Sequence, residues 1–301
     1  MSLRPVALIG ADVDPRLPGM RRLPAWDAWD PLDLIPHLET GLGADLPKVT
    51  WLIRADDTIR HVTGSFESGY TTRHAMWARL EARGHELGWH FHHWTFGERA
   101  SGFDPNPQWL PDAYAAVASL YPVCSTRLGW DYANRETMER LESLGIQIDF
   151  SAIPGHLVWW SVDGERIVVD WRRCPTVPYH PSRADYQRPG DAPLRLLEVP
   201  ITSFRASAAG MARRAVWRLL HGEWSLRGLA AKTRMMTEVW PSPPPPSDVL
   251  AFFFHPEELA ANGIANFGRN VAMLRERFDP EFVTARELAS RLANGRGLSV
   301  R

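Results

Sequence analysis

Short apolar runs that resemble buried β-strands alternate with helical stretches, and this alternation restricts the possible folds more than any other feature. Helices are expected at residues 73–83, 135–144 and 280–293, the second with Asn134 as its N-cap and Gly145 just past its end. The alternation predicts a parallel α/β architecture. The candidate strands are residues 6–10, 49–54, 86–90, 146–150, 167–170, 196–200 and 250–255.

One region departs from this alternation. Residues 206–238 form a basic stretch with helical character, in which six Lys and Arg residues face only Glu223 and Glu238. The sequence P-S-P-P-P-P at 241–246 then predicts an extended connector before the last strand. We therefore expect one domain over residues 1–301, with a basic helical insertion at about 206–247.

Charge and cysteine content exclude several classes of protein. The 34 Lys and Arg residues nearly balance the 35 Asp and Glu residues, so no overall field attracts the chain to nucleic acid or to a membrane. Cys124 and Cys174 can form at most one disulfide, which favours two reduced thiols. Asp12 and Asp14 interrupt the apolar start too early for a signal peptide, and no uncharged run approaches the roughly 18–20 residues that span a bilayer. We expect a soluble, cytoplasmic protein.

Carboxylates follow the first predicted strand, at the end where parallel α/β folds build their active sites. Asp12 and Asp14 lie two positions apart, so one could ligate a cation while the other takes a proton from water. The alternative is a pair of turn or capping aspartates, for which Asp14-Pro15 is well suited.

Histidines concentrate around a second predicted strand end, in the sequence G-H-E-L-G-W-H-F-H-H-W at 84–94. His90 and His92 are two apart and share one face of a strand, so both could bind one metal ion. The alternative is a histidine-rich surface turn. A third strand end presents His255 after three phenylalanines, in a position for general acid catalysis, although a lone histidine there is more often structural.

Taken together, these motifs resemble the NodB-homology polysaccharide deacetylase superfamily, carbohydrate esterase family four and its relatives, over about residues 6–259. The resemblance implies a distorted (β/α)7 barrel of the glycoside hydrolase/deacetylase type. It also implies that Asp12 is the catalytic base, that Asp14 and His90 are metal ligands, and that His255 is the general acid.

The family's third motif, R-x-P-[YW] followed by L-x-x-x-G and D-x-S, resembles Arg127-Leu128-Gly129-Trp130 and the residues after it, Leu141, Gly145, Asp149 and Ser151. By this resemblance, Arg127 orients the base and keeps it ionised. The fourth motif is only loosely similar to Asp170-Trp171-Arg172, from which Asp170 could reach Arg127 or the catalytic centre.

Two positions differ from the family pattern. The second histidine ligand usually lies four residues after the first, where this chain has Trp94. His92 or His93 must replace it, and we expect His92, because W-H-x-H-x-W resembles a divergent cytoplasmic branch of the superfamily. The proline of R-x-P is replaced by Gly129, which could reshape the groove.

The remaining candidates are expected to contact substrate. The aspartates would bind sugar hydroxyls and the tryptophans would form walls against sugar rings, with solvated loop charges and core packing as the alternatives. These candidates are Asp56, Asp57, Trp94, Trp130, Asp170 and Trp171.

The resemblance implies a metal-dependent hydrolase that removes the acetyl group from an N- or O-acetylated sugar or glycoside. Zn²⁺ suits the ligand set best, and Co²⁺, Ni²⁺ or Mn²⁺ could also bind. The alternatives are a saccharide-binding barrel that has lost catalysis, or a hydrolase of another C–N bond in a small molecule.

A cytoplasmic enzyme does not meet finished cell-wall polymer, so we expect a small glycoside or an activated, lipid-linked sugar as substrate. Arg213, Arg214 and Arg218 are expected to assist the binding of an anionic substrate or membrane surface. The alternative is a solvated helical face that packs Trp217 and Leu220 on the barrel.

Overall fold

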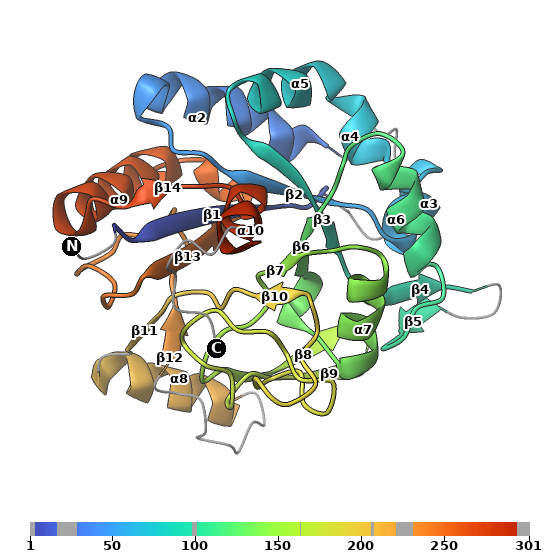
Figure 1. The fold of residues 1–301 in the computed structure, drawn as a ribbon. Coiled ribbons are helices and arrows are strands. Elements are labelled where there is room, and N and C mark those ends of the chain that lie inside the picture. Colours follow the sequence, from blue (N-terminus) through green and yellow to red (C-terminus); the bar gives the residue numbers. More distant parts are fainter. Residues whose placement is uncertain are drawn as a thin grey trace.

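A curled parallel sheet lies at the centre of the computed structural model, which describes residues 4–16, 29–97, 101–162, 164–205, 208–220 and 231–293. The strand order is β10-β7-β6-β3-β2-β1-β13, with β14 paired to β1, and every pair is parallel (Figure 1). The strands are β1 (Val6–Val13), β2 (Thr50–Arg54), β3 (Glu86–Phe91), β6 (Ser125–Leu128), β7 (Ile148–Asp149), β10 (Leu197–Glu198), β13 (Val249–Phe254) and β14 (Glu281–Phe282).

The two edges of this sheet come together beyond β10. The backbone N–H of Thr202 donates to the carbonyl oxygen of Ala251 in β13 at 2.8 Å, and the N–H of Ala251 donates to Thr202 Oγ1 at 2.9 Å. The described strands therefore curl into a distorted, seven-stranded barrel whose last seam is a short contact instead of a ladder. The fold class predicted from the sequence is confirmed.

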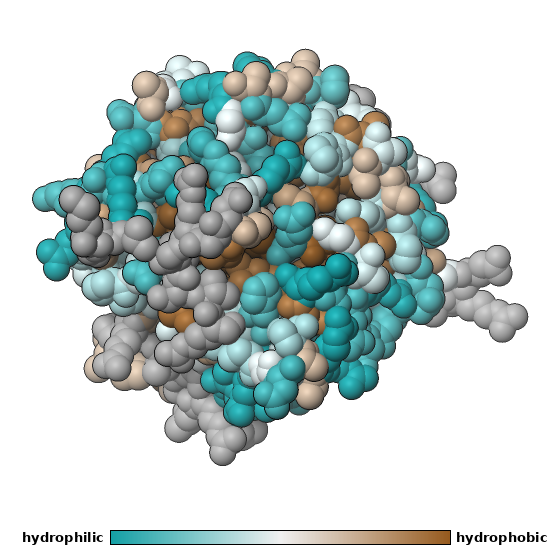
Figure 2. Space-filling view, in the orientation of Figure 1, coloured by the Kyte–Doolittle hydropathy of each residue, from teal (hydrophilic) through white to brown (hydrophobic). Residues whose placement is uncertain are grey.

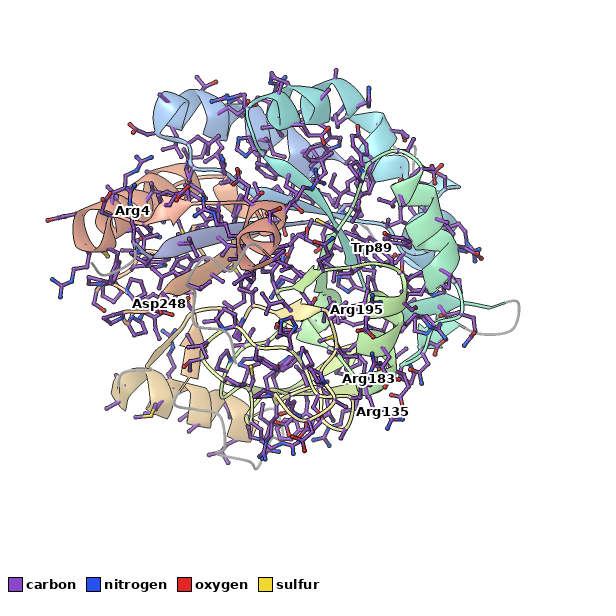
Figure 3. All side chains as sticks on the ribbon, in the orientation of Figure 1. Arg4, Trp89, Arg135, Arg183, Arg195 and Asp248 are labelled. Atoms are coloured by element: carbon purple, nitrogen blue, oxygen red, sulfur yellow. The ribbon has the colours of Figure 1, made fainter. Side chains whose placement is uncertain are left out.

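Alternate residues of the strands face two different hydrophobic clusters. In β1, Val6 and Leu8 pack inside the barrel with Leu52, while Ala7 and Ile9 pack in the layer between the sheet and the outer helices. Strands buried on both faces read as continuous apolar runs, which is why the sequence located them. Several tryptophans belong to the outer layer; Trp89, labelled in Figure 3, is buried, and its Nε1 donates to the carbonyl oxygen of Ala55 at 2.8 Å.

Helices surround the outer side of the sheet (Figure 1). The predicted helices at 73–83 and 135–144 are confirmed as α5 and α7, with the Asn134 N-cap and a left-handed Gly145 at φ 88°. The helices are α2 (Ile35–Leu42), α3 (Asp57–Thr63), α4 (Ser68–Thr72), α5 (His74–Ala82), α6 (Leu110–Ala118), α7 (Arg135–Ser143), α8 (Ala208–Leu220), α9 (Gly263–Phe278) and α10 (Ala285–Ala293). Short 3₁₀ helices are η1 (Asp30–Leu34), η2 (Gly43–Asp45), η3 (Gly129–Asp131) and η4 (Pro256–Leu259).

Two predicted elements differ in place or extent, and one strand was missed. Residues 167–170 form a strand as predicted but do not enter the barrel, because they belong to an antiparallel hairpin of β8 (Leu157–Val162) and β9 (Glu165–Asp170). The barrel takes β6 instead, whose sequence S-T-R-L is too short and polar to show as a buried strand. The helix predicted at 280–293 begins only at Ala285, because residues 281–282 pair with β1 as β14.

The basic insertion is helical only in part, which corrects the prediction of a helix through residue 238. Helix α8 ends at Leu220, and β12 (Ala231–Thr233) pairs antiparallel with β11 (Ser203–Arg205). Residues 221–230 lie outside the described residues. Residues 241–246 form neither helix nor strand, as expected of an extended connector.

The surface drawn in Figure 2 is mainly hydrophilic, with hydrophobic residues gathered near its centre. A cavity of 330 Å³ between β7, β10 and α10 is lined by Ile148, Leu197 and Leu292. Cys124 and Cys174 are buried and free, as expected from the sequence. In the described part of the chain, no helix has the length and hydrophobicity needed to cross a membrane.

The α7 cap gives a first testable prediction. Asn134 accepts the N–H of Thr137 at 2.7 Å and donates its amide to Pro105 O at 2.8 Å. Asn134→Ala should lower the free energy of unfolding by about 1 kcal/mol, because an N-cap acceptor is lost. Asn134→Asp keeps the acceptor and should lose less, while Arg135→Ala serves as the exposed control. Equal stability of wild type and Asn134→Ala in urea unfolding would contradict the cap.

Candidate metal centre

Four strands of the sheet bring polar side chains to one end of the barrel. The ends of β1, β3, β6 and β13 supply Asp12, His90, Arg127 and the segment that leads to His255. Parallel strands place their carboxyl ends together, so residues far apart in sequence converge there. They line a cavity of 180 Å³, whose wall consists of Asp12, Asp14, His90, His92, Arg127, Trp130, Asp131, Met235, Phe253 and His255.

Asp14, His90 and His92 converge as a set of possible metal ligands. Their ligand atoms all lie within 4.8 Å of one another. The Nε2 atoms of His90 and His92 are 3.1 Å apart, and they lie 3.7 Å and 3.5 Å from the carboxylate oxygens of Asp14. Two nitrogens bound to one tetrahedral Zn²⁺ at 2.0–2.1 Å would be about 3.3 Å apart, so the donor spacing fits a single ion.

The protonation states also suit a cation. His90 Nδ1 lies 2.6 Å from the carbonyl oxygen of Arg127, which can only accept, so Nδ1 carries the proton and Nε2 keeps its lone pair. Burial lowers the pKa of His90 to about 4 and also lowers the pKa of His92, so both rings are neutral at pH 7. Burial by itself would raise the pKa of Asp14, but His90, His92 and Arg54 hold it well below its ordinary value.

A buried ion pair behind the ligands fixes two of them. Arg54 donates from Nε to Asp56 at 2.7 Å and from Nη1 to Asp14 at 3.1 Å. Asp56 also accepts the backbone N–H of His92 at 2.9 Å and caps α3 by accepting the N–H of Ile59 at 3.0 Å. Asp56 therefore positions the ligands from within the protein, and its full burial corrects the prediction that it contacts substrate hydroxyls.

Asp57, like Asp56, is buried and bonded to other residues of the protein. Its side chain is 1% exposed, accepts the N–H of Phe96 at 2.7 Å and forms an ion pair with Arg60. It does not line the cavity, so the prediction of a substrate contact is corrected here too. Phe96 lies in β4 (Trp94–Phe96) and Arg60 lies in α3, so Asp57 links the helix to this strand.

Arg127 lies at the centre of a second buried charge cluster. It forms ion pairs with Asp12 and with Asp131, and its guanidinium lies 3.8 Å from the centre of the Phe253 ring. Asp12 is fully buried, and its Oδ1 has no hydrogen-bond partner among the described residues, although it belongs to the cavity wall. Arg127 thus holds one oxygen of Asp12, while the other is unpaired among the described residues.

Sequence reasoning missed Asp131, which takes the place expected for Asp170. Asp170 pairs instead with Arg172, outside the cavity. Trp130 and Asp131 both have left-handed backbone conformations, at φ 57° and 58°, which non-glycine residues rarely adopt. This turn carries Asp131 back to Arg127, and Trp171 supports it by donating from Nε1 to the carbonyl oxygen of Asp131 at 2.8 Å.

His255 also lines the cavity, and it approaches the same oxygen of Asp12 that Arg127 contacts. Its Nε2 lies 3.7 Å from Asp12 Oδ2, and its Nδ1 lies 3.4 Å from Glu258 Oε1. Burial by itself would lower the pKa of His255, but the hydrogen bond to Glu258 and the charges of Asp12 and Asp14 raise it to about 9. His255 is therefore protonated at pH 7, as a general acid must be.

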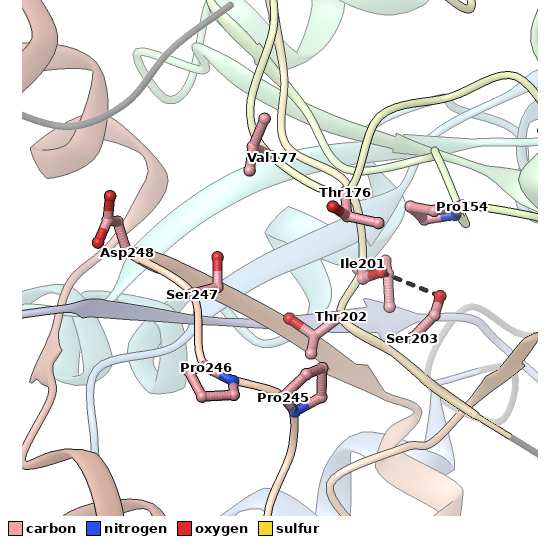
Figure 4. A pocket seen from close by; sticks show the side chains of 10 residues that line it. All are labelled: Pro154, Thr176, Val177, Ile201, Thr202, Ser203, Pro245, Pro246, Ser247 and Asp248. Atoms are coloured by element: carbon pink, nitrogen blue, oxygen red, sulfur yellow. Dashed lines mark hydrogen bonds between the residues drawn. The ribbon is translucent and has the colours of Figure 1, made fainter.

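A larger cavity lies away from this cluster. It measures 510 Å³ and is lined by Pro154, Thr176, Val177, Ile201, Thr202, Ser203, Pro245, Pro246, Ser247 and Asp248 (Figure 4). Ser203 Oγ there donates to the carbonyl oxygen of Ile201 at 3.3 Å. Among the described residues, no imidazole and one carboxylate line this cavity, so the possible metal ligands gather in the smaller one.

No family model and no curated protein matches the sequence. Among solved structures, a Mycobacterium smegmatis protein assigned as a polysaccharide deacetylase is similar over 100% of this chain and 97% of its own, with 16% identity and a TM-score of 0.52. A Parabacteroides distasonis protein assigned as a glycoside hydrolase/deacetylase is similar over 97% and 72% of the two chains, with 10% identity and a TM-score of 0.53. This chain has the deacetylase barrel fold. The resemblance predicted from the sequence is confirmed at the level of the fold.

Within this deacetylase fold, His92 and not His93 joins the cluster. His93 points to the other side of the chain, where its Nε2 lies 3.0 Å from Thr137 Oγ1 in α7. Burial lowers the pKa of His93 to about 3, as expected of a neutral imidazole packed in the core. The geometry therefore agrees with the ligand set Asp14, His90 and His92.

The two departures from the deacetylase pattern are physically linked. A Cβ atom on Gly129 would lie 2.2 Å from Cδ2 of the His92 ring, so any side chain at 129 would exclude that ring. Trp94, at the usual histidine position, is 2% exposed and packs near Trp130 with ring centres 6.2 Å apart. Loss of the motif proline thus provides the space that the shifted histidine occupies.

Of the three tryptophans predicted to contact substrate, one lines the cavity and two do not. Trp130 lines the cavity, and its ring lies 4.5 Å from the ring of His92. Trp94 and Trp171 are buried behind the cavity wall, so they support the site instead of facing a substrate in this cavity.

The link between residues 92 and 129 can be tested by a double-mutant cycle on metal-free protein. Gly129→Ala should lower the free energy of unfolding by about 1–3 kcal/mol, because the added methyl overpacks against the His92 ring. In a His92→Ala background the same substitution should have almost no effect. Equal destabilisation in both backgrounds, measured by urea unfolding, would show that the two residues are not coupled.

The ionisation of His255 can be measured by NMR titration of metal-free protein. Its ring should titrate near pH 9, and Glu258→Gln should lower that pKa, because the hydrogen-bonded carboxylate is lost. A folded pKa above the unfolded value of about 6.5 stabilises the folded state fully below pH 6.5, and this contribution disappears as pH rises through about 9. A ring that titrates near 6.5 in both proteins would contradict this environment.

Proposed function

We propose that this protein is a metal-dependent hydrolase that removes the acetyl group from an N- or O-acetylated sugar or small glycoside. One observation carries the proposal: three metal-competent side chains share a single cavity with a held carboxylate and a protonated imidazole. A binding module would have no need for this combination of acid, base and ligands. The deacetylase fold of the solved neighbours supports the same reaction class.

The donor set fits a catalytic divalent cation. Asp14, His90 and His92 offer one carboxylate and two neutral imidazoles, which leaves further coordination positions open. Zn²⁺ suits these donors best, while Co²⁺, Ni²⁺ and Mn²⁺ are compatible with them. When bound, such an ion would polarise the acyl carbonyl and lower the pKa of a water molecule.

The residues of the chain divide the proton transfers between them. Asp12 would accept the proton of the attacking water through Oδ1, the oxygen that Arg127 leaves free. Arg127 holds the other oxygen in place. His255, whose Nε2 lies 3.7 Å from that oxygen, would donate its proton to the departing amine or alcohol.

The size of the cavity restricts what it can enclose. A volume of 180 Å³ is below the roughly 300–1,000 Å³ of pockets that enclose drug-sized ligands. The cavity therefore suits an acetyl group and the atoms of the bond to be cut, with the sugar itself toward the opening beside Trp130. This arrangement leaves the specificity for the acyl group to Met235 and Phe253, which together with Trp130 are the apolar members of the wall.

Variants at the cavity separate metal binding from proton transfer. Elemental analysis should find a divalent ion in purified wild-type protein and should find none in His90→Ala. Asp12→Asn and His255→Ala should keep it but lose about 10²–10⁴-fold in the rate of acetate release from acetylated sugars. Asp45→Asn, an exposed carboxylate 80% accessible at its side chain, is the control and should be unchanged.

Other outcomes assign the alternatives. Protein that binds no divalent ion after zinc loading would contradict the hydrolase. Protein that binds metal and a saccharide without turnover would favour a barrel that has lost catalysis, and release of ammonia or an amine without acetate would favour another C–N bond.

A further inference from the structure

Helix α8 turns an apolar face toward solvent. Its exposed residues are Ala208, Ala209, Ala212, Arg213, Val216, Leu219 and Leu220. Val216, Leu219 and Leu220 are 55%, 46% and 78% exposed, and their spacing of three and four residues places them on one stripe. A surface helix normally buries its apolar stripe, so the exposure of these three aliphatic side chains in α8 is unusual.

This exposure is concentrated and is not spread over the molecule. Among the described residues six large hydrophobic side chains are exposed, and three of them belong to α8. Figure 1 shows α8 at the periphery, beside β11 and β12. The exposure of Leu220 also corrects the alternative in which this residue packs on the barrel.

The same helix is positively charged. It contains Arg213, Arg214 and Arg218 and no acidic residue, although Lys and Arg nearly balance Asp and Glu over the whole chain. Arg213 is exposed beside the apolar stripe. Local positive charge next to exposed aliphatic side chains is typical of helices that lie on anionic lipid surfaces.

We propose that the exposed face of α8 docks on an anionic membrane surface. A soluble phosphorylated sugar would account for the arginines but not for three exposed aliphatic side chains. A symmetric contact with a second copy would place two sets of arginines against each other. A membrane surface accounts for both features, because the aliphatic side chains enter the acyl boundary while the arginines meet lipid phosphates.

The docked helix is connected closely to the candidate metal centre. Strand β12, which pairs with the strand before α8, ends at Thr233, and Met235 two residues later lines the cavity. If the proposed function holds, a cavity joined in this way to a membrane-docked helix would take an acetylated sugar that is carried by a lipid.

Vesicle sedimentation tests the docking without any measurement of turnover. Wild-type protein should bind phosphatidylcholine vesicles that contain phosphatidylglycerol, and bind pure phosphatidylcholine far less. The variant with Arg213→Gln, Arg214→Gln and Arg218→Gln should bind about 10²-fold more weakly, since each cation near an anionic surface contributes about fivefold. This loss should shrink as salt rises.

The apolar face is tested by Leu219→Ser with Leu220→Ser, which should also weaken vesicle binding by at least about tenfold. Leu120→Ser is the matched control, because Leu120 is 46% exposed like Leu219 but lies outside α8. Circular dichroism and metal content should be unchanged in all variants.

Three results would overturn the proposal. In the first, wild type binds anionic vesicles no better than neutral ones. In the second, the leucine variant binds as well as wild type, which would indicate that the arginines bind a soluble anion instead. A dimer in light scattering that the leucine variant abolishes would assign the face to a second copy. Vesicle binding without acetate release would contradict the proposed hydrolase and leave the docking intact.

Discussion

The buried ion pair between Arg54 and Asp56 holds the candidate metal centre in its geometry. Arg54 bonds Asp14, and Asp56 bonds the backbone of His92, so two of the three ligands depend on one pair. A buried pair tolerates desolvation only when its hydrogen-bonding groups are satisfied, and loss of one partner typically destabilises by about 3–5 kcal/mol. Asp56 meets this requirement because it also caps α3, which ties ligand geometry to the position of a helix.

The charges and hydrogen bonds of the cavity oppose one another across a short distance. His90, His92 and Arg54 hold the pKa of Asp14 well below its ordinary value, and burial lowers the pKa of His90 to about 4, so the three possible ligands together are anionic at pH 7. On the other side, Arg127 holds Asp12 while Glu258 helps to keep His255 protonated. Neighbouring groups of the same cavity thus have opposite protonation states, which is the arrangement that acid–base catalysis requires.

The region after β10 links the basic insertion to this chemistry. Thr237, four residues past β12, donates its hydroxyl to Glu258 Oε2 at 3.1 Å, and Glu258 in turn contacts His255. Met236 donates its N–H to the carbonyl oxygen of Phe253 at 3.0 Å, so the returning segment packs along β13. The insertion that carries α8 is therefore anchored on the same strand that leads to His255.

The sequence by itself indicated a parallel α/β architecture and placed Asp12, Asp14, His90 and His255 at strand ends, because buried strands and their polar ends are local patterns, and the family resemblance implied the barrel. Tertiary packing decided the rest. The choice of His92 over His93 depends on which side of a strand end each ring takes and on the space left by Gly129. Asp131, and not Asp170, pairs with Arg127. Asp56 is a buried support of the ligands because it pairs with Arg54. Partners distant in sequence, or turned inward by an unusual backbone, leave no periodic signal in the sequence.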